Sequence, residues 1–310
     1  MDAQLALPEG FSARPCTPED VDAVFGMVAA CEERDTGAIE IEREDIRAWW
    51  SRPTLDLATD TIAVVDDATG EVVAQGEVTF GTRADACVHP ERRGLGIGTW
   101  LLRWTEMHAR EHDQPRIGQT VPDSAADAVD LLERNGYEWL WTSWILQIRF
   151  DERAPEPPRL PPGYAMRDFV PGQDDHAVHQ MIDDAFLEWS DREPETVEEW
   201  ASTTTRREGF EPWLLPVVVD AEDRIVGAAY LINSDAEEGW VQQLAVHRDH
   251  RSRGLGGALL AGSFRRFHER GRRACGVNTD SRTGALGLYE HVGMSVRRTY
   301  THRSLPLNAG

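Results

Sequence analysis

Two arginine- and glycine-rich stretches carry the residue types best suited to hold a ligand. The string VHPERRGLGIGTWLL fills residues 88–102, and VHRDHRSRGLGGALL fills residues 246–260, which begin 158 positions further along the chain. The two strings match at Val-His, at an arginine, at two glycines and at the final Leu-Leu, so chance is a poor explanation. The chain therefore repeats one pattern, which indicates a duplicated domain.

The second copy has the features of a phosphate-binding loop. The apolar run WVQQLAV, residues 240–246, predicts a buried strand, and ALLAGSFRRFHERG predicts an amphipathic helix that Gly271 closes. A loop between such elements leaves backbone N–H groups unpaired at the positive end of the helix dipole. Glycine lets an anion approach those groups closely, and Arg251 and Arg253 add positive charge. We therefore predict a pyrophosphate-binding loop.

Three further types of glycine-rich loop have to be compared with this one. A Walker loop requires Gly-Lys-Ser/Thr, and the chain contains no lysine. A dinucleotide-binding loop needs an early strand–helix–strand unit, whereas each string lies in the middle of its half, behind several predicted strands. A glycine-rich connector that binds nothing remains open, more so for the first copy than for the second.

The pattern Arg-x-x-Gly-x-Gly between a strand and a helix resembles the acetyl-CoA loop of the GNAT superfamily of N-acetyltransferases. It occurs at residues 251–256 after the strand end Leu244-Ala245-Val246, and at residues 93–98 after Val88. The later stretch VNTDSRTGALGLYEHVGM resembles a second motif of the family, in which Asn and Tyr flank a helix that ends in Gly. Both halves share the likeness, and the tandem layout is similar to that of mycothiol synthase.

The resemblance implies acetyl-CoA as the acyl donor and assigns roles in the second half. The pantetheine arm would lie along the strand end, the loop amides would bind the pyrophosphate, and Tyr289 would face the CoA sulfur. The implied cofactor residues are Leu244, Ala245, Val246, Arg251, Ser252, Arg253, Gly254, Leu255, Gly256, Gly257 and Asn278. The corresponding candidates in the first half are Val88, Arg93, Gly94, Gly96 and Gly98.

Acetyl transfer from a thioester to an amine needs a neutral amine, stabilisation of an oxyanion and a proton for the departing thiolate. The backbone N–H near Val246 meets the second need, and Tyr289, a phenol with an ordinary pKa of about 10, suits the third. The alternative role for Tyr289 is packing on the sheet. We name no general base, because Glu237, Glu238 and the acids of residues 190–200 are more simply solvated charges.

The first half lacks two of these groups. Alignment of the later motifs places Leu132 where Tyr289 stands, and a leucine cannot donate a proton. The same alignment places Thr120 or Val121 where Asn278 stands. The first half is therefore predicted to be a divergent copy that is structural, regulatory or an inactive CoA binder.

The elements that position these motifs follow the same order in both halves: a short strand, helices, a strand pair, the loop, a helix, a strand, a helix and closing strands. This order predicts an α/β fold of two tandem GNAT-like domains, each a central mixed, mostly antiparallel sheet flanked by helices. Five prolines in DERAPEPPRLPP prevent regular structure there. We therefore place a non-catalytic domain at residues 1–150, a linker at 151–162 and a catalytic domain at 163–310.

The bulk composition restricts the partners. The 310 residues include 32 basic and 54 acidic side chains, a net charge of −22, which disfavours nucleic acid and anionic membranes as partners. The cysteines, Cys16, Cys31, Cys87 and Cys275, have no spacing typical of a zinc site or a disulfide framework, so no metal is expected. No stretch is typical of a signal peptide or a membrane span, so a cytoplasmic location is expected.

The leading functional prediction is an acetyl-CoA-dependent N-acetyltransferase that acts, in its second domain, on a primary amine of a small molecule. The alternative, from a different class, is a CoA-binding sensor or interaction module without turnover. The sequence leaves the acceptor amine and the oligomeric state open.

Overall fold

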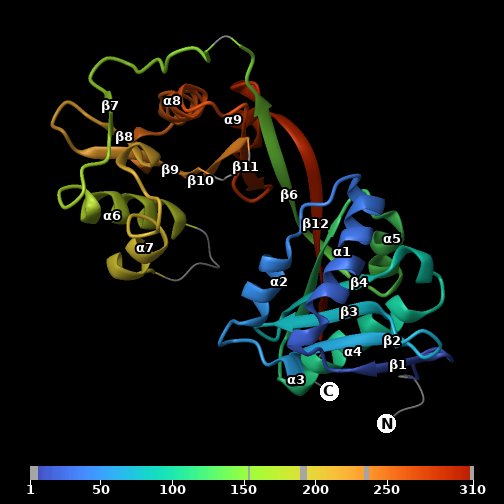
Figure 1. Ribbon diagram of the computed structural model, residues 1–310. Helices are drawn as coiled ribbons and strands as arrows, with labels where there is room; N and C mark the ends of the chain where they lie inside the picture. The colour runs from blue at the N-terminus through green and yellow to red at the C-terminus, as the bar shows by residue number, and fades with distance from the viewer. Residues whose placement is uncertain (1–5, 153, 189–193, 234–236, 308–310) are drawn as a thin grey trace. The chain divides into compact units, whose positions relative to one another are not determined.

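The computed structural model describes residues 6–152, 154–188, 194–233 and 237–307. Its contacts divide the chain into two compact units. Unit 1 comprises Met1–Ser143 and Arg298–Gly310, and unit 2 comprises Trp144–Arg297. Two long strands, β6 (Glu138–Arg149) and β12 (Ser295–Pro306), supply residues to both units. Figure 1 shows that each unit consists of helices packed around a sheet.

Unit 1 is built on one mixed sheet. Its strands follow the order β1-β2-β3-β4-β5-β12, in which β4 and β5 run parallel and the other neighbours antiparallel. Besides β6 and β12, the helices and strands are β1 (Phe11–Arg14), α1 (Val21–Thr36), α2 (Arg43–Trp50), α3 (Leu57–Asp60), β2 (Thr61–Asp66), β3 (Val72–Thr79), β4 (Arg83–Val88), α4 (Ile97–Glu111), β5 (Arg116–Pro122) and α5 (Ala126–Arg134).

Helices cover both faces of this sheet, because successive strand residues point to opposite sides. In β2, Ala63 packs into a cluster with α1 and α2, whereas Val64 packs against α4. Helix α1 buries Val24, Met27 and Cys31 on one side, the spacing of an amphipathic helix. Helices α4 and α5 share a second cluster on the other face.

Unit 2 repeats this architecture. Its strands follow the order β7-β8-β9-β10-β11-β6, with β10 and β11 parallel and β7 to β10 antiparallel to one another in turn. Besides β6, the helices and strands are β7 (Ala165–Asp168), α6 (Asp175–Phe186), α7 (Val197–Thr203), β8 (Pro216–Val219), β9 (Ile225–Asn233), β10 (Glu238–Val246), α8 (Leu255–Glu269), β11 (Ala274–Asp280) and α9 (Leu286–His291).

The core of unit 2 also lies on both sides of its sheet. In β8, Val217 packs with α6 and α7, and the next residue, Val218, packs with α8 and α9. Helix α8 buries Leu255, Leu259 and Phe267 against the sheet, which fixes the direction of the loop that precedes it. The two units thus position their glycine-rich loops in the same way, between the parallel strand and the helix behind it.

The fold class was predicted correctly as an α/β fold with mixed, mostly antiparallel sheets flanked by helices. The predicted linker contains no helix or strand over its described residues 151–152 and 154–162. The contact-defined units differ from the predicted domains 1–150 and 163–310 at β6 and β12. The reason is that each of these 12-residue strands is long enough to contribute to both units.

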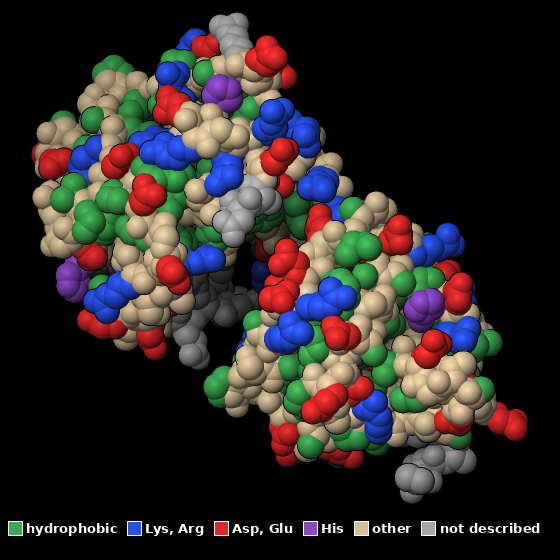
Figure 2. Space-filling view, in the orientation of Figure 1, with side chains coloured by type: hydrophobic (Ala, Val, Ile, Leu, Met, Phe, Trp, Pro, Cys, Tyr) green, Lys and Arg blue, Asp and Glu red, His purple; other side chains and the backbone are tan. Residues whose placement is uncertain are grey.

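Charged side chains of both signs are interspersed on the visible face of the molecule (Figure 2). Some of the arginines pair with carboxylates at matching places in the two units. Arg14 contacts Asp20 at 2.6 Å in unit 1, and Arg167 contacts Asp174 at 2.6 Å in unit 2. Within the described residues, no helix combines the length and the apolar composition that a bilayer crossing requires.

Candidate functional site

Strands β10 and β11 separate where the first predicted cofactor residues begin. They pair in parallel as far as Val241 and Val277, and no pair joins their remaining residues, all of which the structure describes. The register between β10 and β9 shifts after Val241, so Gln242 forms a bulge, and β9 then stays paired with β10 as far as Val246. Residues 242–246 therefore have a free backbone edge on the β11 side, where an extended ligand chain can pair.

The loop after β10 presents a run of unpaired backbone amides. The amide of Arg251 donates to the carbonyl of Arg248 at 3.4 Å, and that of Ala258 donates to the carbonyl of Gly254 at 3.0 Å. Between them, the amides of residues 252–257, all within the described chain, donate no hydrogen bond. These amides lie at the N-terminus of α8, the positive end of its dipole, an arrangement that suits a pyrophosphate.

Two glycines shape this loop. Gly254 precedes α8 with a φ of 81°, a conformation that residues with a side chain rarely adopt. A Cβ atom on Gly256 would lie 3.2 Å from Cδ2 of Leu288, so this glycine lets α9 pack closely on the first turn of α8. The structure thereby brings the loop and the helix that carries Tyr289 into one apolar cluster.

The two loop arginines are engaged with protein groups. Arg251 donates from Nε to the carbonyl of Val246 at 3.0 Å and from its two terminal nitrogens to Glu188 at 2.8 and 3.0 Å. This bonding lowers the pKa of Glu188. Arg253 donates to the hydroxyl of Tyr164 at 2.8 Å. These side chains therefore hold the loop in place, besides adding the positive charge that the sequence indicated.

Tyr289 and Asn278 flank the separated strands. Tyr289, in α9, is 6% exposed and belongs to the same apolar cluster as Leu244 and Val246. Burial raises the pKa of Tyr289 to about 12, and its hydroxyl makes no hydrogen bond to another described residue. Asn278 is exposed and directly follows Val277, at the point where β10 and β11 part.

The acids of unit 2 that the sequence singled out have other roles wherever the structure describes them. Glu237 is exposed, and Glu238 lies at the start of β10, where it bonds to neighbouring side chains. Of the acids considered from sequence, Asp191 and Glu193 lie outside the described residues. Glu199 forms a capping box with Thr196 at the start of α7, which agrees with its simpler role in a charged helix start.

Unit 1 contains the same kind of loop. The amides of residues 94–99, all described, donate no hydrogen bond, and they lie before and within the first turn of α4. Arg93 donates from Nε to the carbonyl of Val88 at 3.2 Å and from both terminal nitrogens to Asp35 at 2.7 Å. Strands β4 and β5 likewise separate beyond the pair Ala84 and Gln119.

A cavity of about 760 Å³ lies between these separated strands of unit 1. Its wall includes Cys31 of α1, Val88 at the end of β4, Gly94 and Gly96 of the loop, and Tyr300 of β12. The volume is within the range of about 300–1,000 Å³ that small-molecule and cofactor sites occupy. The first copy of the loop therefore opens onto a space large enough for a ligand.

The groups that unit 1 was predicted to lack are replaced as follows. Leu132 in α5 is 2% exposed and packs in the core, so it offers no proton. Thr120 on β5 shares a hydrogen bond of 2.8 Å with Nδ1 of His302. Strands β3 and β4 stay in register from the pair Ala74–Val88 to the pair Thr79–Arg83, without the bulge found in unit 2.

Unit 1 has two carboxylates that the sequence analysis missed. Glu77 on β3 lies directly opposite Asp85 on β4, and Asp85 immediately follows the last β4–β5 pair. Glu77 accepts a hydrogen bond from the indole N–H of Trp50 at 3.3 Å, and burial together with the nearby Asp85 raises its pKa. Only the register of the strands brings this pair together, and unit 2 has Tyr230 opposite Gln243 at the same place.

Comparisons with known proteins agree with the repeated loop. A family model described as the acetyltransferase (GNAT) family matches residues 176–294, and another described as an acetyltransferase (GNAT) domain matches residues 58–139. The two matches fall on different units and include both glycine-rich loops.

Relatives match nearly the whole chain. A GCN5-related N-acetyltransferase from Sphaerobacter thermophilus, known from a crystal structure, is 32% identical with a TM-score of 0.84, over 98% of each chain. A tandem GNAT protein from the clavulanic acid biosynthesis pathway has the same fold, with 18% identity and a TM-score of 0.70 over 97% of this chain and 99% of that one. A mycothiol acetyltransferase of Streptomyces coelicolor is 27% identical over 91% of each chain. The chain therefore belongs to the GCN5-related N-acetyltransferase (GNAT) family, whose members transfer acetyl groups from acetyl-CoA.

Proposed function

We propose that the chain transfers the acetyl group of acetyl-CoA to a primary amine of a small molecule, and that the residues from 163 onward carry the active centre. The observation that supports this most directly is the run of unpaired amides at residues 252–257, at the start of α8. A diphosphate is the ligand group that such a run at a helix N-terminus binds best.

The cofactor would extend from this loop along the free edge of β10. Its pantetheine arm, which is rich in amide groups, would pair with the backbone of Leu244, Ala245 and Val246 in place of a neighbouring strand. Asn278 is exposed at the opposite side of the gap, where its amide is available to the cofactor. The loop arginines hold this frame, because Arg251 ties the end of β10 to the loop.

In the proposed reaction, the lone pair of the neutral amine attacks the thioester carbonyl and forms a C–N bond. A backbone N–H near Val246 stabilises the oxyanion of the tetrahedral intermediate. The intermediate collapses with cleavage of the C–S bond, and the sulfur takes the proton of the Tyr289 hydroxyl. The tyrosinate regains a proton from the nitrogen, directly or through water, so protons and electrons balance.

The test is a thiol-release assay on a panel of small primary amines, with mass spectrometry of the product. We expect CoA release that depends on the amine and an amide product that resists hydroxylamine, which cleaves esters and thioesters. Because mycothiol acetyltransferases are among the relatives, the panel includes a thiol-containing amino sugar. Release of CoA without an acetylated amine would refute N-acetylation.

The second candidate function is CoA binding without turnover. It is favoured by unit 1, where a cavity of about 760 Å³ and a loop of unpaired amides coexist with Leu132 at the place of the phenol. We propose that unit 1 binds CoA without catalysing transfer. If calorimetry shows that the chain binds CoA and no amine of the panel is acetylated, unit 2 too would bind CoA without turnover.

A further inference from the structure

Two histidines and one aspartate gather at the end of α4 that is remote from the glycine-rich loop. Helix α4 has 15 residues, so its two ends lie about 20 Å apart at the usual rise of 1.5 Å per residue. His108 lies near the C-terminal end of this helix, His112 caps it, and Asp60 is the last residue of α3. The cluster is thus separate from the candidate cofactor site, although it belongs to the same unit.

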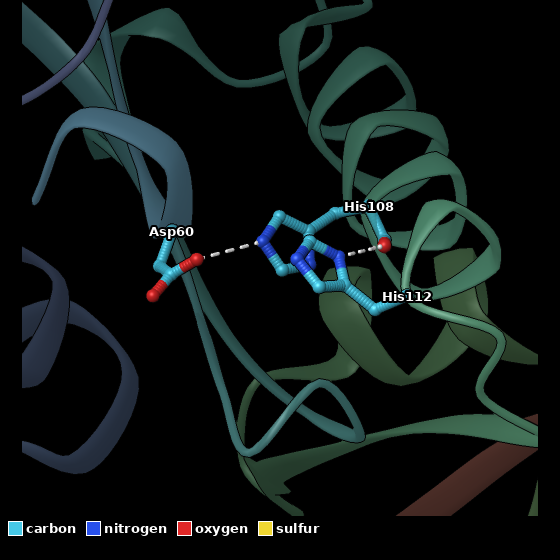
Figure 3. Close-up of side chains that lie close together, drawn as sticks. All are labelled: Asp60, His108 and His112. Atoms are coloured by element: carbon cyan, nitrogen blue, oxygen red, sulfur yellow. Dashed lines mark hydrogen bonds and ion pairs between the residues drawn. The ribbon is translucent and has the colours of Figure 1, made fainter. Parts of the chain in front are cut away.

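The three side chains converge in space (Figure 3). Nε2 of His108 lies 3.0 Å from Oδ1 of Asp60. One ligand atom from each of the three residues lies within 4.8 Å of those from the other two. Two ligand atoms held by one tetrahedral ion at about 2.1 Å are about 3.4 Å apart. At 3.0 Å, Asp60 and His108 are therefore close to the separation of two metal ligands, and His112 has to approach them.

Hydrogen bonding determines which nitrogen of His112 is available. Its Nδ1 lies 2.8 Å from the carbonyl oxygen of His108. A carbonyl oxygen only accepts, so Nδ1 carries a proton, and in the neutral ring Nε2 keeps its lone pair. A metal-bound histidine normally donates its other N–H in this way, which fixes the tautomer. Because His112 is exposed at the helix end, its ring can turn toward the other two ligands.

His108 presents the second nitrogen ligand from the interior. The residue is 5% exposed, and its Nδ1 has no hydrogen-bond partner among the described residues. A cation that replaces the proton between Nε2 and Asp60 leaves the ring proton on Nδ1, where no existing hydrogen bond has to break. The rings of His108 and His112 are stacked with centroids 4.3 Å apart, so the two imidazoles already lie side by side next to Asp60.

The surroundings favour a cation. The carboxylate of Asp60 accepts hydrogen bonds from the amide of Asp56 at 2.9 Å and the hydroxyl of Thr59 at 3.0 Å, which hold it in one orientation. The cluster lies at the C-terminal end of α4, where the helix dipole is negative. The net charge of −22 also attracts cations to the chain as a whole.

From this geometry we infer a Zn²⁺ site in unit 1 with three protein ligands: Nε2 of His108, Nε2 of His112 and a carboxylate oxygen of Asp60. Imidazole and carboxylate ligands suit Zn²⁺, and water completes its coordination. The bound ion joins the end of α3 to the end of α4 and so stabilises unit 1. The cysteine spacing predicted no metal site, whereas the sequence signal for this one is His-x-x-x-His in HAREH, residues 108–112.

The test uses the full chain after removal of metals with a chelator. Calorimetric titration with ZnCl₂ is expected to show one equivalent of tight binding, and thermal unfolding is expected to shift to higher temperature with Zn²⁺. Mg²⁺, which prefers oxygen ligands, is expected to have no such effect. His112→Ala is expected to weaken Zn²⁺ binding at least about tenfold. As His112 is exposed, this variant should fold like the original chain.

His176→Ala is the matched control, because His176 is an exposed histidine on α6 of unit 2. It should bind Zn²⁺ as the original chain does. Asp60→Asn keeps the size of the side chain, and it is expected to weaken binding while circular dichroism reports an intact fold. Absence of Zn²⁺ binding to the original chain, or equal binding by His112→Ala, would overturn the inference. Neither result bears on acetyl transfer, since no proposed cofactor residue is altered.

Discussion

Arg251 donates two hydrogen bonds to the carboxylate of Glu188, at 2.8 and 3.0 Å. Its Nε also donates to the carbonyl of Val246, so a single side chain ties the segment after α6 to the end of β10 and to the loop. Arg93 has the same relationship to Asp35 in unit 1. An arginine that occupies the same place in both units and faces a carboxylate is placed to fix the shape of the loop.

The first prediction concerns this contact. Arg251→Ala is expected to weaken acetyl-CoA binding about threefold or more, the effect of an exposed ion pair that orders a loop. Glu188→Gln is expected to change affinity in the same direction. Isothermal titration calorimetry with acetyl-CoA measures both. Arg248→Ala is the matched control, because it removes an equal charge from an exposed side chain of the same loop. Equal losses for Arg248→Ala and Arg251→Ala would contradict a positioning role.

The second prediction tests which of the two loops serves the reaction, by changing one equivalent glycine in each. Gly254 has a φ of 81°, and Gly96, which precedes α4 in the same way, has a φ of 90°. A Cβ on Gly254 would meet no other atom within 4 Å, and one on Gly96 would lie 3.4 Å from Cγ of Pro8, an ordinary contact. Alanine at each position should therefore cost about 1–2 kcal/mol from backbone strain alone, measurable by urea unfolding. If unit 2 carries the reaction, Gly254→Ala lowers the acetyl-transfer rate and Gly96→Ala does not. The reverse pattern would assign the reaction to unit 1.

Local sequence patterns predicted the parts of the site that depend on neighbouring residues. Gly254 and Gly96 marked both loops, since a helix start that binds an anion needs such residues within a few positions. The partners of the loop arginines were not predictable in this way, because Asp35 and Glu188 lie far from the loops in sequence and only the packed helices bring them close.

Register and strand exchange account for the other differences. The opposition of Glu77 and Asp85 depends on how β3 and β4 pair, which hydrophobic alternation alone does not fix to the residue. The placement of the C-terminal part of β12 beside β5 of unit 1 depends on contacts between distant segments. The same is true of Asp60 and His108, which are joined by tertiary structure alone.

The third prediction uses the buried carboxylate of unit 1. Burial, followed by the charge of Asp85, raises the pKa of Glu77 above its ordinary value of 4.5, so the folded state favours the protonated acid. The resulting stabilisation is complete below pH 4.5 and is lost as the pH rises through the higher pKa of the folded state. Glu77→Gln keeps an acceptor for Trp50 but has no carboxyl group to ionise, so the variant does not lose this stability as the pH rises. Its free energy of unfolding, relative to the original chain, should therefore increase from pH 4 to pH 7.

Urea unfolding at several pH values measures this difference. Glu91→Gln is the control, because Glu91 is an exposed acid in the same unit and its replacement should leave the pH dependence unchanged. If Glu77→Gln followed the same pH dependence as the original chain, Glu77 would be ionised equally well in the folded and unfolded states.

The last prediction tests the proton donor. Burial raises the pKa of Tyr289 to about 12, so its phenol stays protonated at every pH at which the enzyme can be assayed. Tyr289→Phe, which removes this hydroxyl, should then lower kcat about 100-fold or more. We expect little change in KM for acetyl-CoA and no new pH dependence below pH 10. Tyr300→Phe removes a hydroxyl from the cavity of unit 1 and serves as the matched control. An unchanged kcat for Tyr289→Phe together with a fall for Tyr300→Phe would move the donor, and with it the reaction, to unit 1.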